Sequence, residues 1–251
     1  MDDFIDQVVL VTGAGRGIGR VIAEAFATLG AIVAANDINP LNLDETVERI
    51  TATGARAKAY VFDIAKRMPI EAMIAQVVND FGRIDILVNN ATVEPEASIL
   101  DMDEWEFHRT MDVNLGGPFF TMQQVGRMMR QQGSGEMVNI ASISGRGYGL
   151  KGHAAYVASK TGLVGLTREA AHEFSPYNIR VNAVCPGTVG PKMINPQNWD
   201  EAELDKWLEG FPQLRLGAQA EAVGLVLFLC SKAAASLTGH AFDVKCGKVI
   251  G

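Results

Sequence analysis

Short β-branched runs alternate with longer segments of helical period along this 251-residue chain. The helical period is clearest after the first run, where the apolar residues from Ile18 to Leu29 repeat at i, i+3, i+4 spacing until Gly30. The predicted strands are 7–11, 31–36, 57–62, 84–89, 136–141, 179–184 and 241–244. This alternation predicts an α/β fold with one doubly wound, Rossmann-like parallel sheet of about seven strands and helices on both faces.

No linker, repeat or low-complexity tract divides the sequence, so we expect a single domain over 1–251. The longest stretch without the alternating pattern is 188–216, which is rich in proline and follows the sixth predicted strand. Long loops in compact domains are commonly lids or binding loops. We therefore expect 188–216 to be a substrate-binding loop within the domain.

Composition excludes several classes of function. A net charge of -7 without a basic block argues against a nucleic-acid partner, and no apolar run approaches the roughly 18 residues that span a bilayer. The acidic start "MDDFID" is unlike a signal peptide, so we expect a soluble cytoplasmic protein with no membrane partner. The three cysteines and four histidines lack metal-ligand spacing, which predicts free buried thiols and no metal.

The stretch "TGAGRGIG" at 12–19 follows a predicted strand and opens a predicted helix. Glycines in that position allow a tight turn and let the backbone approach a pyrophosphate at the helix N-terminus. Asp37 ends the second predicted strand, where a carboxylate can accept hydrogen bonds from the adenosine ribose and would repel a 2′-phosphate. The expected cofactor is therefore NAD. NADP remains the alternative cofactor, because the Arg16 guanidinium could pair with that phosphate.

Tyr156 and Lys160 are four residues apart in a predicted helix and so share one face. An ammonium close to a phenol favours the phenolate, so we expect Lys160 to lower the pKa of Tyr156 toward working pH. Beside a dinucleotide-binding loop, this pair predicts an acid/base for hydride-transfer chemistry; alone, it would be compatible with an ordinary amphipathic helix.

With these motifs in order, the sequence resembles the classical short-chain dehydrogenase/reductases over nearly its whole length. The matching motifs are the T-G-x-x-x-G-x-G of 12–19, "NNA" at 89–91, "DVNLGG" around Asn114, "NIASISG" at 139–145, the Y-x-x-x-K at 156–160 and "CPG" at 185–187.

The resemblance implies that Tyr156 exchanges the hydroxyl proton, that Lys160 also holds the nicotinamide ribose, and that Asn114 holds a water. Ser142 fits the family's S-x-x-G serine, although it lies 14 residues before Tyr156 instead of 13, and Ser144 is the alternative. The implied catalytic residues are Asn114, Ser142, Tyr156 and Lys160. The implied cofactor-binding residues are Gly13, Arg16, Gly17, Ile18, Gly19, Asp37, Asp63, Ile64, Asn90, Ala91, Tyr156, Lys160, Pro186, Gly187 and Val189.

Three positions depart from the family pattern. Thr92 replaces the glycine after "NNA" and adds a side chain near the expected nicotinamide ribose. Pro191 stands where the family often has a threonine that bonds the carboxamide, and proline has no N–H donor. Near the C-terminus, Lys245 and Cys246 replace the usual aspartate and glycine of a region that often packs at subunit contacts.

Substrate choice should lie with the loops 92–98, 145–153 and 188–216. There, Glu94 and His153 suit a hydroxyl-rich substrate and Arg146 suits an anionic one, although Glu94 and Arg146 would more commonly be solvated surface charges and His153 the start of the next helix. The residues that suit an apolar one are Tyr148, Met193, Trp199, Trp207 and Phe211. We expect an NAD-dependent oxidoreductase acting on a small secondary alcohol or ketone of polyol, sugar or hydroxyacyl type. The alternatives are an NADP-dependent 3-oxoacyl-type reductase and a non-catalytic dinucleotide-binding sensor or scaffold. The resemblance also implies a homotetramer with interface helices at about 104–130 and 154–175.

Overall fold

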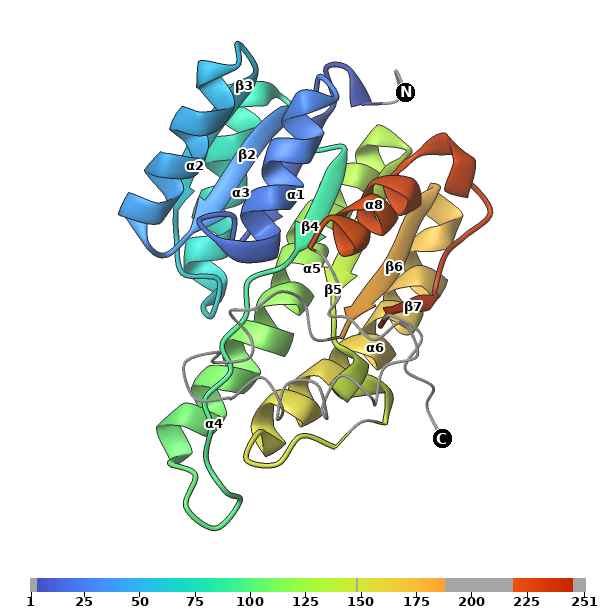
Figure 1. Cartoon of the computed structure of the whole chain (residues 1–251). Coiled ribbons are helices and arrows are strands. Elements are labelled where there is room, and N and C mark those ends of the chain that lie inside the picture. The colour runs from blue at the N-terminus through green and yellow to red at the C-terminus, as the bar shows by residue number, and fades with distance from the viewer. Residues whose placement is uncertain (1–3, 148, 188–218, 246–251) are drawn as a thin grey trace.

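The computed structural model describes residues 4–147, 149–187 and 219–245. Within them, one parallel sheet has the strand order β3-β2-β1-β4-β5-β6-β7 (Figure 1). The strands are β1 (Val8–Thr12), β2 (Ile32–Asp37), β3 (Arg56–Val61), β4 (Ile86–Asn89), β5 (Gly135–Ile140), β6 (Ile179–Pro186) and β7 (Ala241–Val244). The predicted fold class is confirmed, and the predicted strand ends differ from these by no more than two residues.

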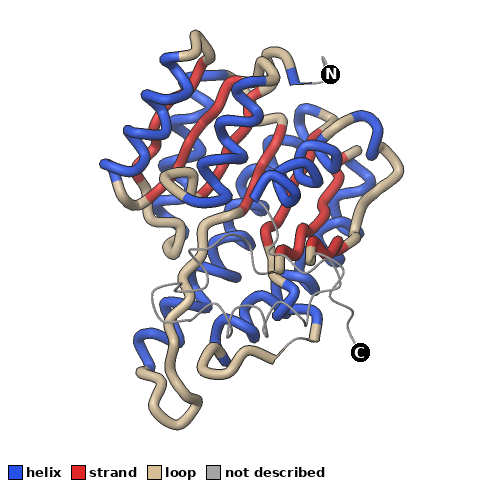
Figure 2. Tube along the Cα trace, viewed as in Figure 1, coloured by secondary structure: helices blue, strands red, loops and turns tan. Residues whose placement is uncertain are grey.

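Helices cover both faces of the sheet (Figure 2). On one face lie α1 (Gly17–Thr28), α2 (Pro40–Ala52) and α8 (Gln219–Cys230). On the other lie α3 (Arg67–Phe81), α5 (Gly117–Gln132) and α6 (Ala154–Phe174). A further helix, α4 (Glu104–Met111), packs against α6 near the carboxyl ends of the strands.

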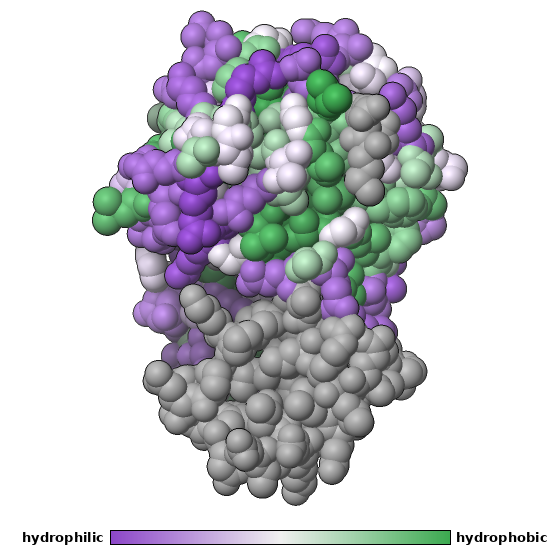
Figure 3. All heavy atoms as spheres, turned by 45° about the horizontal axis from the view of Figure 1, so that its top comes forward, coloured by the Kyte–Doolittle hydropathy of each residue, from purple (hydrophilic) through white to green (hydrophobic). Residues whose placement is uncertain are grey.

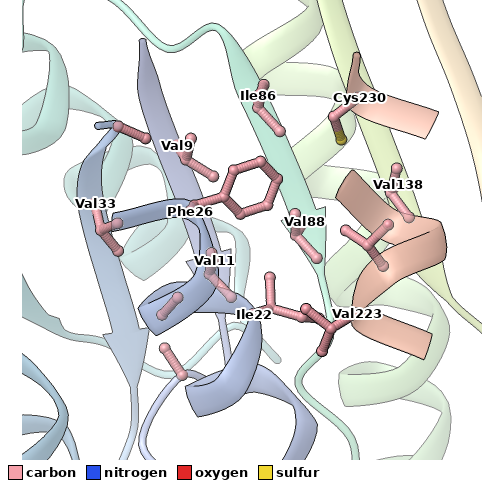
Figure 4. Packing of buried hydrophobic residues seen from close by; sticks show 14 of the residues in the cluster. Val9, Val11, Ile22, Phe26, Val33, Ile86, Val88, Val138, Val223 and Cys230 are labelled. Carbon is pink, nitrogen blue, oxygen red and sulfur yellow. The ribbon is translucent and has the colours of Figure 1, made fainter. Parts of the chain in front are cut away.

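The core consists of two main layers, one on each side of the sheet. Val9 and Val11 of β1 point toward α1 and α8, where Phe26, Ile22 and Val223 pack against them (Figure 4). The alternate residues of the same strand join the opposite cluster with α3 and α5. A strand buried on both faces needs no polar face, which explains why β1 reads as a continuous apolar run. On the described part of the face in Figure 3, apolar residues gather near the middle, and hydrophilic residues are most frequent at the top and on the left.

The helix expected over about 104–130 is not continuous. A π-helical turn, Asp112–Gly116, separates α4 from α5. The wider turn carries Asn114, whose side chain is fully buried and bonded to the segment after β4. Single π-turns inside helices frequently occur at functional positions, and this interruption has no periodicity signal that the sequence could reveal.

The strand order changes direction at β1, which pairs with β2 on one side and β4 on the other. In open parallel sheets, ligands bind beyond the carboxyl ends of the strands at this kind of switch point. The glycine-rich loop follows β1, and "NNA" follows β4, so the topology brings these two motifs together.

Candidate functional site

The loop after β1 has a shape that only glycine permits. Gly13 and Gly17 have φ angles of 64° and 59°, in the left-handed region that other residues rarely adopt. Gly19 has no room for a side chain, because a Cβ there would lie 2.1 Å from the carbonyl oxygen of Gly13. The loop backbone thus folds tightly against the first turn of α1, which leaves helix N–H groups free to face a phosphate.

Asn90 and Thr12 brace this loop from β4 and β1. The Asn90 amide donates to the carbonyl oxygens of Thr12 and Gly13, each at 3.0 Å. In return, the backbone N–H groups of Asn90 and Ala91 donate to the Thr12 hydroxyl at 3.0 and 3.2 Å. Asn90 therefore holds the loop rather than presenting its amide to a ligand, and the role of Thr12 was missed from sequence.

Arg20 is a second brace that sequence reasoning missed. Its guanidinium donates to the carbonyl oxygen of Gly15 and to the Thr46 hydroxyl, and it forms an ion pair with Glu45 at 2.8 Å. These contacts tie the glycine-rich loop to α2. By contrast, Arg16, at the N-cap of α1, is exposed.

Asp37 lies at the last position of β2, directly beside the glycine-rich loop. One carboxylate oxygen accepts from the Gly15 N–H at 3.0 Å and the other from the Asn39 N–H at 2.9 Å. A Cβ on Gly15 would approach that carboxylate to 2.8 Å. The negative charge of Asp37 is thereby fixed next to the loop, which is where a ribose would need an acceptor.

Asp63, after β3, forms a bidentate ion pair with Arg109 of α4. The two guanidinium nitrogens lie 2.7 and 3.2 Å from its carboxylate oxygens. Burial raises the pKa of Asp63, but the bonds from Arg109 and from the Ala65 N–H outweigh it and leave the pKa below its ordinary value. Ile64 beside it is buried against Gly117. Nothing in the sequence spacing indicated the partnership with Arg109.

Tyr156 and Lys160 share one face of α6, and both are buried, with 7 % and 2 % of their surfaces exposed. The Lys160 ammonium donates to the carbonyl oxygen of Ile140 at 2.8 Å and lies 5.7 Å from the centre of the Tyr156 ring. The predicted shared face is therefore present, and the ammonium is fixed by the end of β5.

The expected lowering of the Tyr156 pKa is wrong. Burial raises the pKa of Tyr156 well above its ordinary value, and the charge of Glu94 raises it further, while a hydrogen bond from Ser142 opposes both. Burial also lowers the pKa of Lys160 to about 8, which Glu94 and Cys185 partly offset. Desolvation, which the helical spacing does not reveal, is the largest cause of both shifts.

Ser142 and Ser144 begin the turn between β5 and α6, and both are buried. Ser142 is near enough to Tyr156 to lower the pKa of its hydroxyl, whereas Ser144 donates its backbone N–H to the Ser142 hydroxyl at 3.1 Å. Gly145 lets this turn lie against α6, since a Cβ there would be 2.7 Å from the Lys160 backbone. The contact with Tyr156 favours Ser142 over Ser144.

The Asn114 amide is fully engaged by protein groups. Its nitrogen donates to the Val93 carbonyl and the Ser159 hydroxyl, and its oxygen accepts from the Val93 N–H. Thr92, the residue that replaces the family's glycine, donates its hydroxyl to the same oxygen at 3.0 Å. The departure at Thr92 therefore adds a bond to Asn114.

The remaining predicted positions lie at the end of β6 or outside the described residues. Pro186 ends β6, and the Gly187 N–H donates to the Val244 carbonyl at 2.7 Å, which joins the turn to β7. Ile18 packs partly buried beside the core. Val189, Pro191 and the whole 188–216 loop lie outside the described residues, as do Tyr148 and Cys246.

Among the residues that the structure describes, no group of three or more histidine, cysteine or acidic side chains could hold a metal ion. None of the described helices is long and apolar enough to cross a bilayer. Cys185 and Cys230 are buried free thiols.

Comparisons with known proteins agree with this arrangement. The family model described as enoyl-(acyl carrier protein) reductase matches residues 13–248. An oxidoreductase of Thermotoga maritima, named as uncharacterized, is 40% identical over 98% of both chains. A 3-oxoacyl-[acyl-carrier-protein] reductase of the same organism is 36% identical over 97% of this chain and 98% of its own.

Solved structures show the same likeness. An NAD+-bound xylitol dehydrogenase is 33% identical with a TM-score of 0.91, covering 97% of this chain and 99% of its own. A short-chain type dehydrogenase/reductase from Mycobacterium marinum is 32% identical with a TM-score of 0.91, covering 99% of this chain and 98% of its own. With the glycine-rich loop and the buried tyrosine–lysine pair at the carboxyl ends of one sheet, these likenesses establish that the chain belongs to the classical short-chain dehydrogenase/reductase family of oxidoreductases.

Proposed function

We propose that the chain is an NAD-dependent oxidoreductase that interconverts a secondary alcohol and a ketone of polyol, sugar or hydroxyacyl type. The observation that carries the proposal is the buried Tyr156 side chain, with the Lys160 ammonium held 5.7 Å from the centre of its ring by the Ile140 carbonyl. A chain that only binds a dinucleotide has no chemical need for such an acid/base, which argues against the sensor or scaffold alternative.

Each residue has a distinct part in this chemistry. The glycine-rich loop and Asp37 would hold NAD, which when bound would supply the hydride acceptor. Tyr156 accepts the proton of the alcohol and returns it to the ketone in the reverse direction, while Ser142 holds the substrate oxygen. The Lys160 charge favours the phenolate once Tyr156 gives up its proton. Asn114 fixes the segment after β4 against α6.

Asp37 supports NAD over NADP. Its carboxylate is held by the Gly15 and Asn39 N–H groups, so it cannot swing away from a 2′-phosphate without losing both bonds. Arg16, the residue that could pair with that phosphate, is exposed at the start of α1. The NAD+ bound in the structure of the similar xylitol dehydrogenase is consistent with this preference.

A 3-oxoacyl-type reductase is the second candidate function. It is favoured by the similarity to the 3-oxoacyl-[acyl-carrier-protein] reductases of Thermotoga maritima and Staphylococcus epidermidis, 36% and 39% identical. The two candidate functions share the proton transfer by Tyr156 and differ in the substrate groups attached to the reacting carbon.

A substrate screen separates these candidates. NADH and NADPH binding would be titrated by fluorescence, and absorbance at 340 nm would follow turnover of polyols, sugars, hydroxy acids and 3-oxoacyl thioesters. We expect tighter binding of NADH and turnover of one substrate class. Binding of either cofactor without turnover of any class would contradict the enzyme assignment and favour the sensor.

We also propose a homotetramer that uses the groove between α5 and α6. The groove has a volume of 290 Å³, and Phe119 at its side leaves 43 % of its surface exposed. It carries basic residues on α5 (Arg127, Arg130) and acidic ones on α6 (Glu169, Glu173). A second copy related by a two-fold axis therefore offers complementary charges. Light scattering of the wild type and of Phe119→Glu tests this: we expect a tetramer for the wild type and a smaller species for the variant, and a wild-type monomer would contradict it.

The proposed location is the cytoplasm. The described cysteines are unpaired and buried, as suits a reducing compartment.

A further inference from the structure

Two polar side chains that the proposed reaction does not use lie beside Tyr156. Glu94 belongs to the segment between β4 and α4, and His153 immediately precedes α6. The two segments run side by side beyond the carboxyl ends of the strands, where Ala97 and His153 form a parallel bridge (Figure 1). The Ala97 N–H donates to the Gly152 carbonyl at 2.8 Å. The backbone therefore holds the segment that carries Glu94 against the one that carries His153.

The pair is close but not hydrogen-bonded. The Glu94 Oε1 and His153 Nδ1 atoms are 3.9 Å apart, beyond the range of a direct hydrogen bond. His153 Nδ1 is buried and has no hydrogen-bond partner among the described residues. Burial raises the pKa of the Glu94 carboxyl, although the charges of His153 and Lys160 lower it. Two partly desolvated polar atoms thus face each other with hydrogen-bonding capacity that the described residues do not meet.

The position of the pair relates it to the reacting atoms. His153 lies three residues before Tyr156, less than one helical turn along the chain. The charge of Glu94 acts on both Tyr156 and Lys160, so its carboxylate lies within electrostatic reach of both. A hydroxyl oxygen about 2.8 Å from each atom would bridge Glu94 and His153 with two good hydrogen bonds.

We propose that Glu94 and His153 bind a second hydroxyl of the substrate, on the carbon next to the one that is oxidised. This inference rests on the proposed function and narrows its substrate class to vicinal diols and polyols. The bound hydroxyl donates to the Glu94 carboxylate and accepts from the Nδ1–H of His153. A substrate without that hydroxyl leaves the buried His153 Nδ1 atom unpaired and the partly exposed Glu94 carboxylate without its acceptor contact, so the site should disfavour it.

Matched substrates that differ by one hydroxyl give the sharpest test. The pairs are 2,3-butanediol with 2-butanol, and trans-1,2-cyclohexanediol with cyclohexanol, each measured as kcat/KM with saturating NAD at one pH. We expect the wild type to prefer the diol at least ~10-fold, as loss of a hydrogen bond to a charged group implies. Glu94→Ala should bring the preference close to 1, because no carboxylate remains to accept the hydroxyl.

Two further variants test whether the ratio of kcat/KM for diol and monohydroxy alcohol reports the second hydroxyl. His153→Phe keeps a planar ring without Nδ1 and should also remove the preference; the His153 side chain makes no capping bond that the change would break. Glu96→Ala removes the same charge two residues along the segment and should leave the preference unchanged. Since Glu94 also affects Tyr156, its removal alters the rate on both substrates, and only their ratio reports the hydroxyl contact.

Other results would overturn the inference. One such result is an equal fall in kcat/KM for the diol and for the monohydroxy alcohol in Glu94→Ala. Another is a wild-type enzyme with the same kcat/KM for both substrates. Turnover of a 3-hydroxyacyl thioester with none of either alcohol would also overturn it while leaving an oxidoreductase. Failure of the proposed function itself has a different signature, namely NADH binding with no turnover of any substrate.

Discussion

The two halves of the sheet build their parts of the site in different ways. In the half around β1 and β2, backbone shape makes the site: glycines that exclude side chains, with Asn90 and Arg20 holding the loop. In the half around β5 and β6, buried side chains make it, and their properties depend on burial. A site made of backbone tolerates almost no added atoms, whereas a site made of buried polar side chains is sensitive to charge and solvation.

The largest expected effect belongs to the side-chain half. Tyr156→Phe removes the only atom proposed to exchange the proton and should lower kcat by ~100-fold or more. NADH affinity should change little, because the glycine-rich loop is untouched. Stopped-flow turnover and fluorescence titration measure the two quantities, and comparable turnover in the variant would refute the assigned role.

A matching test of the backbone half is Gly19→Ala. The new Cβ would lie 2.1 Å from the Gly13 oxygen and 2.3 Å from the Asn90 amide nitrogen, so the loop must shift. We expect a loss of about 3 kcal/mol in the free energy of unfolding and weaker NADH binding. Urea denaturation and NADH titration measure these losses. The control is Gly224→Ala, an exposed position in α8 where a Cβ meets nothing within 4 Å, and which should be neutral or slightly stabilising.

The pH dependence of stability tests the burial of Lys160. Its pKa is lowered from 10.5 to about 8 in the folded chain, so between these values the unfolded chain binds the additional proton. Stability attributable to this group therefore rises with pH across that window, by up to ~3 kcal/mol. The difference in unfolding free energy between wild type and Lys160→Met should rise accordingly, as measured by urea denaturation from pH 7 to pH 10.5. A pH-independent difference would show that Lys160 titrates normally.

The smallest expected effect is on cofactor choice. Asp37→Ala removes the charge expected to repel a 2′-phosphate and should reduce the preference for NADH over NADPH by ~10-fold, while Asp37→Asn should reduce it less because an amide oxygen can still accept from the ribose. Competitive fluorescence titration compares the two cofactors. An unaltered preference would mean that another residue discriminates between them.

Sequence reasoning was most successful where local chemistry decides the structure. The strands were found because alternation and β-branched runs are local patterns, and the glycine-rich loop because a turn from strand to helix needs glycine at fixed positions. The order of the strands was not predicted, because the rules for their connections narrow the possible orders without selecting one. Asp37 was placed correctly at the end of β2, because that position depends only on where the strand stops.

Tertiary contacts decided the rest. The pairing of Asp63 with Arg109, the hold of Arg20 on Gly15 and the closeness of Glu94 to His153 join residues at sequence separations that carry no pattern. The π-turn at Asn114 has the same origin, since the amide's bonds to Val93 form only when the segment after β4 packs against it.

The sequence by itself determined the strands, the doubly wound class of the sheet and the glycine-rich loop, because these follow from backbone geometry and apolar period. Only the tertiary structure decided the protonation behaviour of the site, as the raised pKa of Tyr156 illustrates. The cost of desolvating a charge depends on all that surrounds it in space, and a four-residue spacing records only one of those neighbours.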